Sequence, residues 1–360
     1  MSARKRIGVL TGGGDAPGLN AVLRAVVRTA GDSAENVEII GVLDGFAGLL
    51  EGRFRHLGAP DVRELIRMGG TVLGTTNRDN PFACRSEHGP VDRSTDCLEN
   101  ARKAGLEALI VIGGDGTLRI ASELGKLGLD VVGVPKTIDN DLASTDYTFG
   151  FWTAIGVATE ALDRLRDTAE SHHRVMVLEV MGRTAGWIAL HAGVAGAADV
   201  ILIPEIPYDP ESVARTVVRC QGRGRASSLI VVAEGATSKG GEMSVHAVDP
   251  TTGVVRLGGA GQRVVRELEA LTRCDVRATV LGHLQRGGSP VAFDRILATQ
   301  FGEAAARLAI AGRCGRMVRL ADGRIEDVDL DEAVREIKLV DPASPLVRTA
   351  RSLGIAFGDE

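Results

Sequence analysis

The chain has 360 residues, a length that suits two domains or one large domain with a deep cleft. Apolar residues make up 44% of the sequence and charged residues 25%, as in ordinary globular proteins. The formal net charge of −5 argues against an extended nucleic-acid-binding surface, although it leaves room for a local basic pocket. The 46 glycines exceed the usual share and gather after apolar runs, where turns approach a ligand or another backbone closely.

The cysteines are scattered, odd in number and without a C-x-x-C pair: Cys84, Cys97, Cys220, Cys274 and Cys314. This usage predicts reduced, structural thiols in a cytoplasmic protein. The apolar run that precedes Thr11 is too short for a signal peptide or a membrane span, and we expect neither there.

Short runs rich in β-branched residues alternate with helix-like stretches along the chain. In chain order, strands are expected at Ile7–Leu10, Val37–Val42, Ala108–Ile112, Val131–Val134, Val175–Val180, Val200–Ile203 and Leu229–Val232. Helices are expected at Asn20–Ala30, Thr95–Ala104, Ile155–Thr168 and Ala260–Leu271. The alternation predicts an α/β fold of mainly parallel sheets with both faces covered by helices. Ligands in such folds bind at the carboxyl ends of the strands, where this chain has its glycine-rich segments.

No Pro/Ser-rich linker divides the chain, so we expect two packed lobes between which the chain crosses near Phe149–Trp152 and returns near residue 260. Residues 1–150 with about 260–315 would form a larger lobe. Residues 151–259, with part of the C-terminal region, would form a smaller lobe. The region after about Arg316 is expected to be less regular.

A first glycine-rich loop, Thr11–Asn20, follows a strand and precedes a helix, so its N–H groups and the helix N-terminus suit an anion. It is not a dinucleotide-binding fingerprint, because Pro17 stands where the third glycine belongs. It is not a P-loop either, because no Gly-Lys-Ser/Thr follows. A tight βα turn explains this loop equally well.

Two later loops carry carboxylates. Glycines frame Asp115 in Gly113–Thr117, which leaves this carboxylate accessible to Mg²⁺, while Thr117 is expected to cap the next helix. In Pro135–Asp141, the acids Asp139 and Asp141 are two residues apart and converge if the segment is extended. Two like charges in one site favour a shared cation, so Mg²⁺ is a natural partner. A solvated Asp-Asn-Asp turn is the ordinary alternative.

Basic residues gather around two further strands. His172, His173 and Arg174 precede one strand and Met181-Gly182-Arg183 follow it, whereas Arg277–Pro290 contains His283 and Arg286. Arginine suits phosphate because its planar fork donates two hydrogen bonds at once. A single surface arginine is usually only solvated charge. Zinc is disfavoured because the adjacent histidines lack a spaced third ligand.

At these residues the sequence closely resembles the phosphofructokinase family. The matching segments occur in the family's order over roughly residues 6 to 300: Gly13–Gly18, Gly113–Thr117, Pro135–Asp141, Glu179–Arg183 and Arg277–Pro290. Gly-Gly-Asp-Gly-Thr alone is a weak signal, since NAD kinases and lipid kinases share it, but the ordered set is specific. The resemblance implies two Rossmann-like lobes with the active site between them, the larger binding nucleotide and Mg²⁺ and the smaller binding a sugar phosphate. It also implies Mg²⁺-dependent transfer of a phosphoryl group to the 1-hydroxyl of fructose 6-phosphate, a step of glycolysis in the cytoplasm.

The resemblance also implies roles for individual residues. Asp139 would be the catalytic base, with Arg183 as the second catalytic residue, and Asp115 would hold Mg²⁺ with Asp141 nearby. The donor phosphates would be bound by Gly13, Arg78, Gly114, Asp115, Gly116 and Thr117. The sugar phosphate would be bound by Thr137, Asp139, Asp141, Met181, Gly182, Arg183, Glu234, His283 and Arg286. Arg174 and Arg277 would reach it from a neighbouring subunit, which implies a homodimer or homotetramer.

The phosphoryl donor is the point on which the resemblance is mixed. Members that use ATP have glycine at the position of Gly116, where a carboxylate would repel the α-phosphate by roughly 4 kcal/mol at about 4 Å with an effective dielectric near 20. Lys136, however, is typical of members that use pyrophosphate. Because the missing side chain at Gly116 admits a nucleotide and a lysine suits either donor, the sequence favours ATP, with pyrophosphate as the alternative.

Other classes remain open from the sequence. A kinase for NAD or a lipid would share Gly113–Thr117 but would not need Arg174, Arg277, His283 and Arg286. A non-catalytic sugar-phosphate sensor would keep these basic residues but have little use for Asp115, Asp139 and Asp141 together. A dehydrogenase is disfavoured by Pro17 in the first loop.

Overall fold

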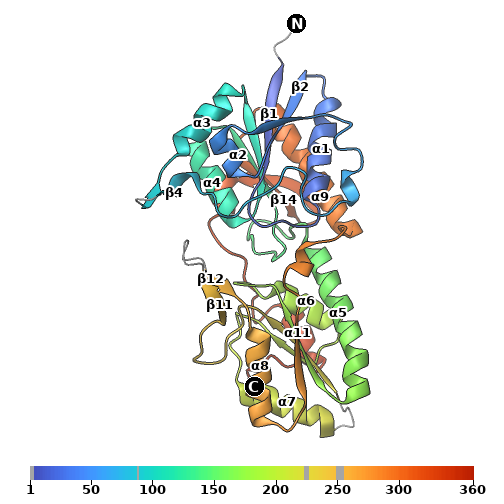
Figure 1. The fold of residues 1–360 in the computed structure, drawn as a ribbon. Helices are drawn as coiled ribbons and strands as arrows, with labels where there is room; N and C mark the ends of the chain where they lie inside the picture. Colours follow the sequence, from blue (N-terminus) through green and yellow to red (C-terminus); the bar gives the residue numbers. More distant parts are fainter. Residues whose placement is uncertain (1–3, 87–88, 223–226, 249–254) are drawn as a thin grey trace. The chain divides into compact units, whose positions relative to one another are not determined.

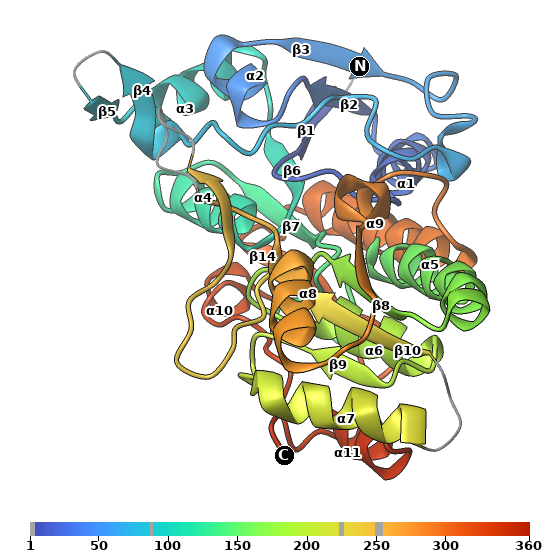
Figure 2. The same ribbon diagram turned by 60° about the horizontal axis from the view of Figure 1, so that its bottom comes forward.

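The computed structural model describes residues 4–86, 89–222, 227–248 and 255–360. The chain forms two compact units, each built of helices around a sheet (Figure 1, Figure 2). The first unit comprises Met1–Ile138, Leu142–Trp152 and Arg286–Ile337, and the second comprises Asp139–Asp141, Thr153–Gln285 and Lys338–Glu360. None of the described helices is both long and apolar enough to cross a membrane.

The first unit contains a seven-stranded sheet of order β15-β14-β7-β6-β1-β2-β3. Its strands are β1 (Lys5–Thr11), β2 (Val37–Val42), β3 (Phe54–Leu57), β6 (Ala108–Gly113), β7 (Val131–Pro135), β14 (Arg316–Ala321) and β15 (Arg324–Asp329). The five inner strands are parallel, and only the edge strands β3 and β15 pair antiparallel. A separate short hairpin joins β4 (Cys84–Ser86) and β5 (Gly89–Val91).

Helices cover both faces of this sheet. They are α1 (Leu19–Gly31), α2 (Phe46–Glu51), α3 (Ser94–Lys103), α4 (Asp115–Lys126), α9 (Ala292–Ile310) and α10 (Leu330–Ala333), with 3₁₀ turns η1 (Leu65–Arg67) and η2 (Pro81–Ala83). Ile110 and Ile112 of β6 pack in the core shared with α1 and α9. Leu109 and Val111, which alternate with them, pack in the core shared with α4. A strand buried on both faces must be apolar throughout, which explains the continuous run in β6.

The second unit contains a parallel four-stranded sheet of order β13-β8-β10-β9. Its strands are β8 (Val175–Val180), β9 (Val200–Leu202), β10 (Ser228–Ala233) and β13 (Val276–Val280), and β11 (Val245–Val248) pairs with β12 (Val255–Leu257) in a separate hairpin. Its helices are α5 (Phe151–His172), which enters this unit at Thr153, α6 (Trp187–Ala195), α7 (Pro210–Gly222), α8 (Ala260–Leu271) and α11 (Pro345–Ser352). The 3₁₀ turn η3 (Gly282–Arg286) follows β13, and its last residue, Arg286, belongs to the first unit. Leu268 of α8 belongs to the same hydrophobic core as Val177 and Val232 on one face. Ile201 of β9 lies against Gly193 of α6 on the other face, where a Cβ would approach it to 2.5 Å.

The predicted α/β fold with two mainly parallel sheets is confirmed, and β2, β8 and α8 have the predicted bounds. The expected irregularity after Arg316 is wrong, because β14 and β15 form a regular hairpin there. Its turn is Asp322-Gly323, whose φ angles of 49° and 75° suit a two-residue turn that matches the strand twist.

The expected return to the larger lobe near residue 260 also needs correction. Helix α8 and strand β13 belong to the second unit, because β13 pairs with β8 along its whole length. The chain returns to the first unit only at Arg286, and the hairpin of β14 and β15 then extends the first sheet beside β7.

Candidate functional site

Three loops of the first unit meet at the carboxyl ends of adjacent parallel strands. The register pairs Thr11 of β1 with Ile112 of β6, and Gly113 with Pro135 of β7. Backbone bonds join the loops directly, because the N–H of Gly12 donates to the Ile112 carbonyl and that of Lys136 to the Gly113 carbonyl, each at 2.9 Å. The glycine-rich segments predicted to hold phosphate are therefore neighbours in space.

Thr117 is packed inside this group of loops and does not cap a helix. Helix α4 begins two residues earlier, at Asp115, with Gly114 as its N-cap and no side-chain cap. A Cβ at Gly12 would lie 2.6 Å from the Thr117 methyl carbon, and one at Gly113 only 2.3 Å from it. The expected capping role is wrong, because Thr117 instead fills the space that these glycines leave.

Asp115 and Gly116 lie in the first turn of α4, where the helix presents the positive end of its dipole. The Asp115 side chain is 26% exposed and accepts bonds from Arg119 Nε at 2.9 and 3.0 Å. A Cβ built at Gly116 would meet no atom within 4 Å apart from its chain neighbours and the backbone of its own helix. The strand end thus carries a carboxylate and, beside it, open space.

Lys136 lies at the other side of the loops and is only 3% exposed. Its ammonium group donates to the carbonyl of Gly14 in the first loop. A Cβ built at Gly13 would lie 3.5 Å from Lys136 Nζ and 3.1 Å from Thr117 Oγ1. The backbone of Gly13 is therefore framed by the buried cation and the hydroxyl, and its φ of 77° favours glycine.

Two arginines flank the first loop from other elements of the same unit. Arg286 Nη1 donates to the Asp15 carbonyl at 3.1 Å, and a Cβ at Gly14 would lie 2.8 Å from this nitrogen. Arg78 is exposed in the turn that follows Thr76, whose carbonyl accepts the Gly13 N–H at 3.0 Å. The Arg286 guanidinium thus contacts the first loop, whereas Arg78 lies two residues after a backbone contact with that loop.

These residues suit Mg²⁺ held together with a phosphate rather than a closed metal site. Within the described part of the chain, no three His, Cys, Asp or Glu side chains converge as a metal-binding group. Mg²⁺ typically uses one or two carboxylates and completes its shell with water and substrate phosphates. The partly exposed carboxylate of Asp115, at a helix N-terminus beside glycine N–H groups, fits that pattern.

Asp139 and Asp141 follow β7 in a segment that is not extended. Asn140, which separates them, is buried and has a φ of 51° in the left-handed region. The predicted convergence of the two acids by strand alternation is therefore wrong in its reason, since the backbone turns between them. The Asp141 carbonyl accepts the Lys338 N–H at 2.9 Å, and the Thr137 carbonyl accepts Thr148 Oγ1 at 2.7 Å. Both ends of the turn are thus held.

In the second unit, the carboxyl ends of β8, β10 and β13 lie side by side. The register pairs Val180 with Ala233 and Glu179 with Val280, so Met181, Glu234 and Leu281 each follow an adjacent strand. The Glu234 N–H donates to the Val180 carbonyl at 2.9 Å. This edge carries the predicted residues Met181, Gly182, Arg183 and Glu234, with His283 two residues beyond Leu281.

Close backbone approach shapes this edge. Gly235 donates to the Gly182 carbonyl at 3.1 Å, and a Cβ at Gly235 would come within 2.0 Å of the Arg183 carbonyl. The Met181 N–H donates to Gln285 Oε1 at 2.7 Å, and Gln285 is fully buried. Arg183 and His283 are exposed, so their side chains are accessible above a fixed backbone.

Arg174 and Arg277 lie at the amino ends of the same strands. Helix α5 ends at His172, and His173 turns the chain with a φ of 55° into Arg174 and β8. Arg277 is the second residue of β13. The two arginines share one carboxylate, because Asp275 accepts Arg174 Nε and Arg277 Nη1, each at 2.6 Å. The structure therefore separates them from the edge that carries Arg183.

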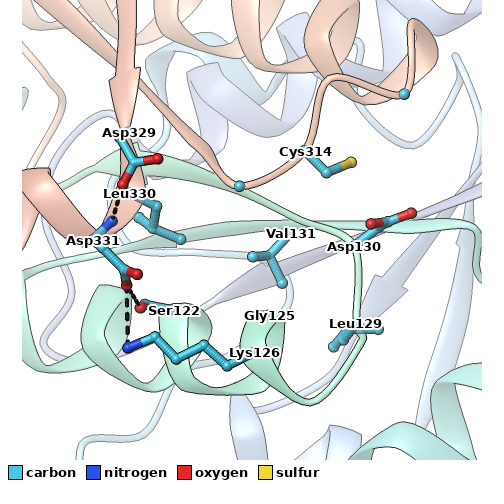
Figure 3. A pocket seen from close by; sticks show the side chains of 12 residues that line it. Ser122, Gly125, Lys126, Leu129, Asp130, Val131, Cys314, Asp329, Leu330 and Asp331 are labelled. Carbon is cyan, nitrogen blue, oxygen red and sulfur yellow. Dashed lines mark hydrogen bonds and ion pairs between the residues drawn. The ribbon is translucent and has the colours of Figure 1, made fainter.

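A cavity of about 410 Å³ lies elsewhere in the first unit (Figure 3). Val131 lines it at the amino end of β7, opposite to the end that carries Lys136. Ser122 and Lys126 of α4 both reach Asp331 across it, the lysine at 3.4 Å. Burial raises the pKa of the Cys314 thiol, which also lines it, to about 11. This cavity is distinct from the glycine loops.

Sequence reasoning overlooked several residues that organise these regions. They are Arg119 on Asp115, Thr75 and Thr76 against Gly13, Gln285 on Met181, and Asp275 between the two arginines. Arg119 was detectable, since an acid and an arginine four residues apart pair on a helix. Asp275 was not, because its link to Arg174 depends on the register of β8 and β13.

Parallel strands that end in glycine loops, with a carboxylate at a helix N-terminus, define an α/β fold suited to phosphate binding. The family model described as Phosphofructokinase matches residues 6–309. The chain therefore belongs to the phosphofructokinase family, and it is a phosphotransferase.

Curated relatives carry two different donor names. One from Chloroflexus aurantiacus, named ATP-dependent 6-phosphofructokinase, is 56% identical over 100% of this chain and 99% of its own length. Another from Amycolatopsis methanolica, named Pyrophosphate–fructose 6-phosphate 1-phosphotransferase, is 52% identical over 94% of this chain and 96% of its own. Among solved structures, the Pichia pastoris phosphofructokinase in the T-state is similar with a TM-score of 0.80 and 30% identity. It covers 99% of this chain, which spans 37% of that longer one.

Proposed function

We propose that this protein is an ATP-dependent 6-phosphofructokinase, which transfers a phosphoryl group from ATP to the 1-hydroxyl of fructose 6-phosphate. The observation that carries the donor assignment is the open space at Gly116 beside the Asp115 carboxylate. A nucleotide needs room for its α-phosphate there, and apart from its chain neighbours and the backbone of its own helix no protein atom lies within 4 Å of a Cβ at that position.

The second candidate is a pyrophosphate-dependent enzyme of the same family. The buried ammonium of Lys136 favours it, because this cation lies beside the first glycine loop and suits a compact, highly charged donor. We weigh Gly116 more heavily, since a missing side chain permits ATP whereas a lysine is compatible with either donor.

Asp139 is the proposed general base, which takes the proton of the 1-hydroxyl as the oxygen attacks the donor. Phosphoryl transfer has a loose transition state with charge on the equatorial oxygens, so positioning and electrostatics dominate catalysis. Mg²⁺, held by Asp115 with Asp141 near it, would neutralise part of the charge on the donor phosphates. Arg183 would stabilise the charge that develops during transfer.

The donor phosphates would lie against the first unit and the sugar phosphate against the second. In the first unit, the N–H groups around Gly13 and Gly114, the Thr117 hydroxyl and Arg78 suit the donor. Met181, Gly182, Glu234 and His283 with Arg183 suit the sugar phosphate. Thr137 and Arg286, which belong to the first unit, are the other residues that the family resemblance assigns to the sugar phosphate.

Arg174 and Arg277 would serve the site of a second copy, as a homodimer or homotetramer would allow. Arg174 precedes β8 and Met181 follows it, seven residues apart, or about 23 Å at roughly 3.3 Å per residue. An arginine side chain does not bridge this length. Arg174 therefore suits a phosphate other than the one beside Arg183 of the same chain.

Parallel assays with MgATP and MgPPi test the donor. We expect turnover of fructose 6-phosphate with MgATP, and strong activity with pyrophosphate alone would overturn the assignment. Turnover of NAD or a lipid would indicate another kinase, and binding of fructose 6-phosphate without turnover by either donor would indicate a sensor.

A further inference from the structure

Asp275 is a single carboxylate that holds two arginines from adjacent strands. Its Oδ2 accepts Arg174 Nε and its Oδ1 accepts Arg277 Nη1, both at 2.6 Å. The backbone fixes the three residues as well, since the Val175 N–H donates to the Asp275 carbonyl at 3.0 Å and β13 pairs with β8 from its first residue. The arrangement is a built feature of the sheet, because each partner is anchored to the same pair of strands.

The contacts with Asp275 leave donor groups on each guanidinium for another ligand. Arg174 uses Nε, and Arg277 uses Nη1, which also donates to the Val276 carbonyl at 2.9 Å. A guanidinium has five N–H donors in a rigid fork, so one or two contacts do not exhaust it. The arginine side chains are 33% and 54% exposed, which keeps the outer edges of both forks accessible to a phosphate.

We propose that Asp275 is a positioning residue for phosphate recognition, which holds Arg174 and Arg277 at the spacing that binds the 6-phosphate of the sugar substrate. The inference rests on the proposed role of these arginines in a neighbouring subunit's site. Without the shared carboxylate, the two cations repel one another and each side chain samples many rotamers. With it, the two forks are oriented before the phosphate arrives, so less entropy is lost on binding.

The charge of Asp275 and its geometry predict opposite effects, which makes the test decisive. A carboxylate close to a phosphate repels it, so by charge alone its removal should strengthen binding. If Asp275 instead positions the arginines, Asp275→Asn weakens binding. We expect the KM for fructose 6-phosphate to rise about tenfold, while kcat and the KM for the donor change by less than about twofold. Calorimetric titration with fructose 6-phosphate alone should show the same loss.

Glu269→Gln is the matched control. Glu269 Oε1 lies 3.8 Å from Nη1 of the same Arg277, but this carboxylate is not shared with Arg174. It removes the same charge, and we expect a KM change below about twofold. Asp275→Glu keeps the carboxylate and should recover most of the affinity. An unchanged or lowered KM in Asp275→Asn, an equal rise in Glu269→Gln, or no recovery in Asp275→Glu would each overturn the proposal.

Arg174→Ala and Arg277→Ala separate this inference from the proposed function on which it rests. If neither variant raises the KM for the sugar phosphate, the proposed role of the arginines fails. If both raise it and Asp275→Asn does not, only the positioning role fails. Sedimentation of each variant completes the test. If Asp275→Asn raises the KM and also dissociates the oligomer, whereas Arg174→Ala leaves the oligomer intact, the positioning role is contradicted.

Discussion

The candidate phosphate sites of the two units differ in whether backbone groups or side chains form them. In the first unit the site is mainly backbone, with glycine loops packed around Thr117 and one buried cation, Lys136. In the second unit it is mainly side chains, since Arg183 and His283 are exposed above a fixed strand edge. A backbone site depends on sheet register and on the absence of Cβ atoms, whereas a side-chain site depends on what orients each charge. Substitutions should therefore act differently in the two units.

The largest effect is expected at Asp139, in the turn that follows β7. Asp139→Ser removes the proposed base, and we expect kcat to fall by about 10²- to 10⁴-fold. Binding of fructose 6-phosphate, measured by calorimetry, should be largely retained, because the basic residues of the second unit are unchanged. The control is Asp130→Asn, because Asp130 precedes β7 whereas Asp139 follows it. This variant should leave kcat almost unchanged. Near-normal turnover of Asp139→Ser would refute the base assignment.

The next largest effect tests whether the tightly packed loops of the first unit require glycine, which has no Cβ. In Gly113→Ala the new Cβ would lie 2.3 Å from Thr117, and such overpacking costs about 1–3 kcal/mol of the free energy of unfolding. Gly116→Ala is the matched control in the same loop, because a Cβ there meets nothing within 4 Å. Thermal unfolding should show a lower midpoint for Gly113→Ala only. Equal midpoints would mean that the loops adjust more easily than their packing suggests.

The same residues also show why part of the site could be predicted from the sequence and part could not. The glycines and Asp115 stand out because their pattern after apolar runs has a direct physical meaning. The role of Thr117 was not predictable, since it depends on α4 beginning at Asp115 and on three strands meeting. Likewise, alternation fails for Asp139 and Asp141 because Asn140 adopts a left-handed conformation that single-sequence patterns do not reveal.

At the level of the fold, local patterns worked where each strand is buried on both faces. The run in β6 is apolar throughout and had no competing interpretation. The hairpin of β14 and β15 was missed because its strands carry arginines and acids at the edge of the sheet. Its Asp322-Gly323 turn was the signal that could have revealed it. The boundary near residue 260 required knowing which sheet β13 joins, and that pairing is long-range.

A smaller effect should distinguish the role of the buried Lys136 in the first unit from the role of the exposed cations in the second. Lys136→Met keeps the length and apolar stem of the side chain but removes its ammonium group from the Gly14 carbonyl. We expect the KM for the donor to rise about tenfold, or about 1.4 kcal/mol, with little change for the sugar phosphate. Initial rates with each donor measure this. A rise confined to the sugar phosphate would assign Lys136 to the other half of the reaction.

The smallest effect is expected at Arg119, which pairs with Asp115 at the edge of the backbone site. This exposed pair four residues apart on α4 contributes only about 0.3–0.5 kcal/mol to stability, so Arg119→Gln should unfold almost as the parent does. Its consequence should lie in metal binding, because the guanidinium competes with a divalent cation for the carboxylate. We expect Arg119→Gln to bind Mn²⁺ more tightly, by about twofold, in electron paramagnetic resonance titrations without donor.

Arg164→Gln is the matched control for that experiment, since Arg164 pairs with Glu160 four residues earlier on α5 and both side chains are more exposed. It should change neither unfolding nor Mn²⁺ binding. If Arg119→Gln also leaves Mn²⁺ binding unchanged, Asp115 is not the carboxylate that holds the metal. The first unit would then rely on its glycine N–H groups and Lys136 for the donor, and its contrast with the arginine-based second unit would become sharper.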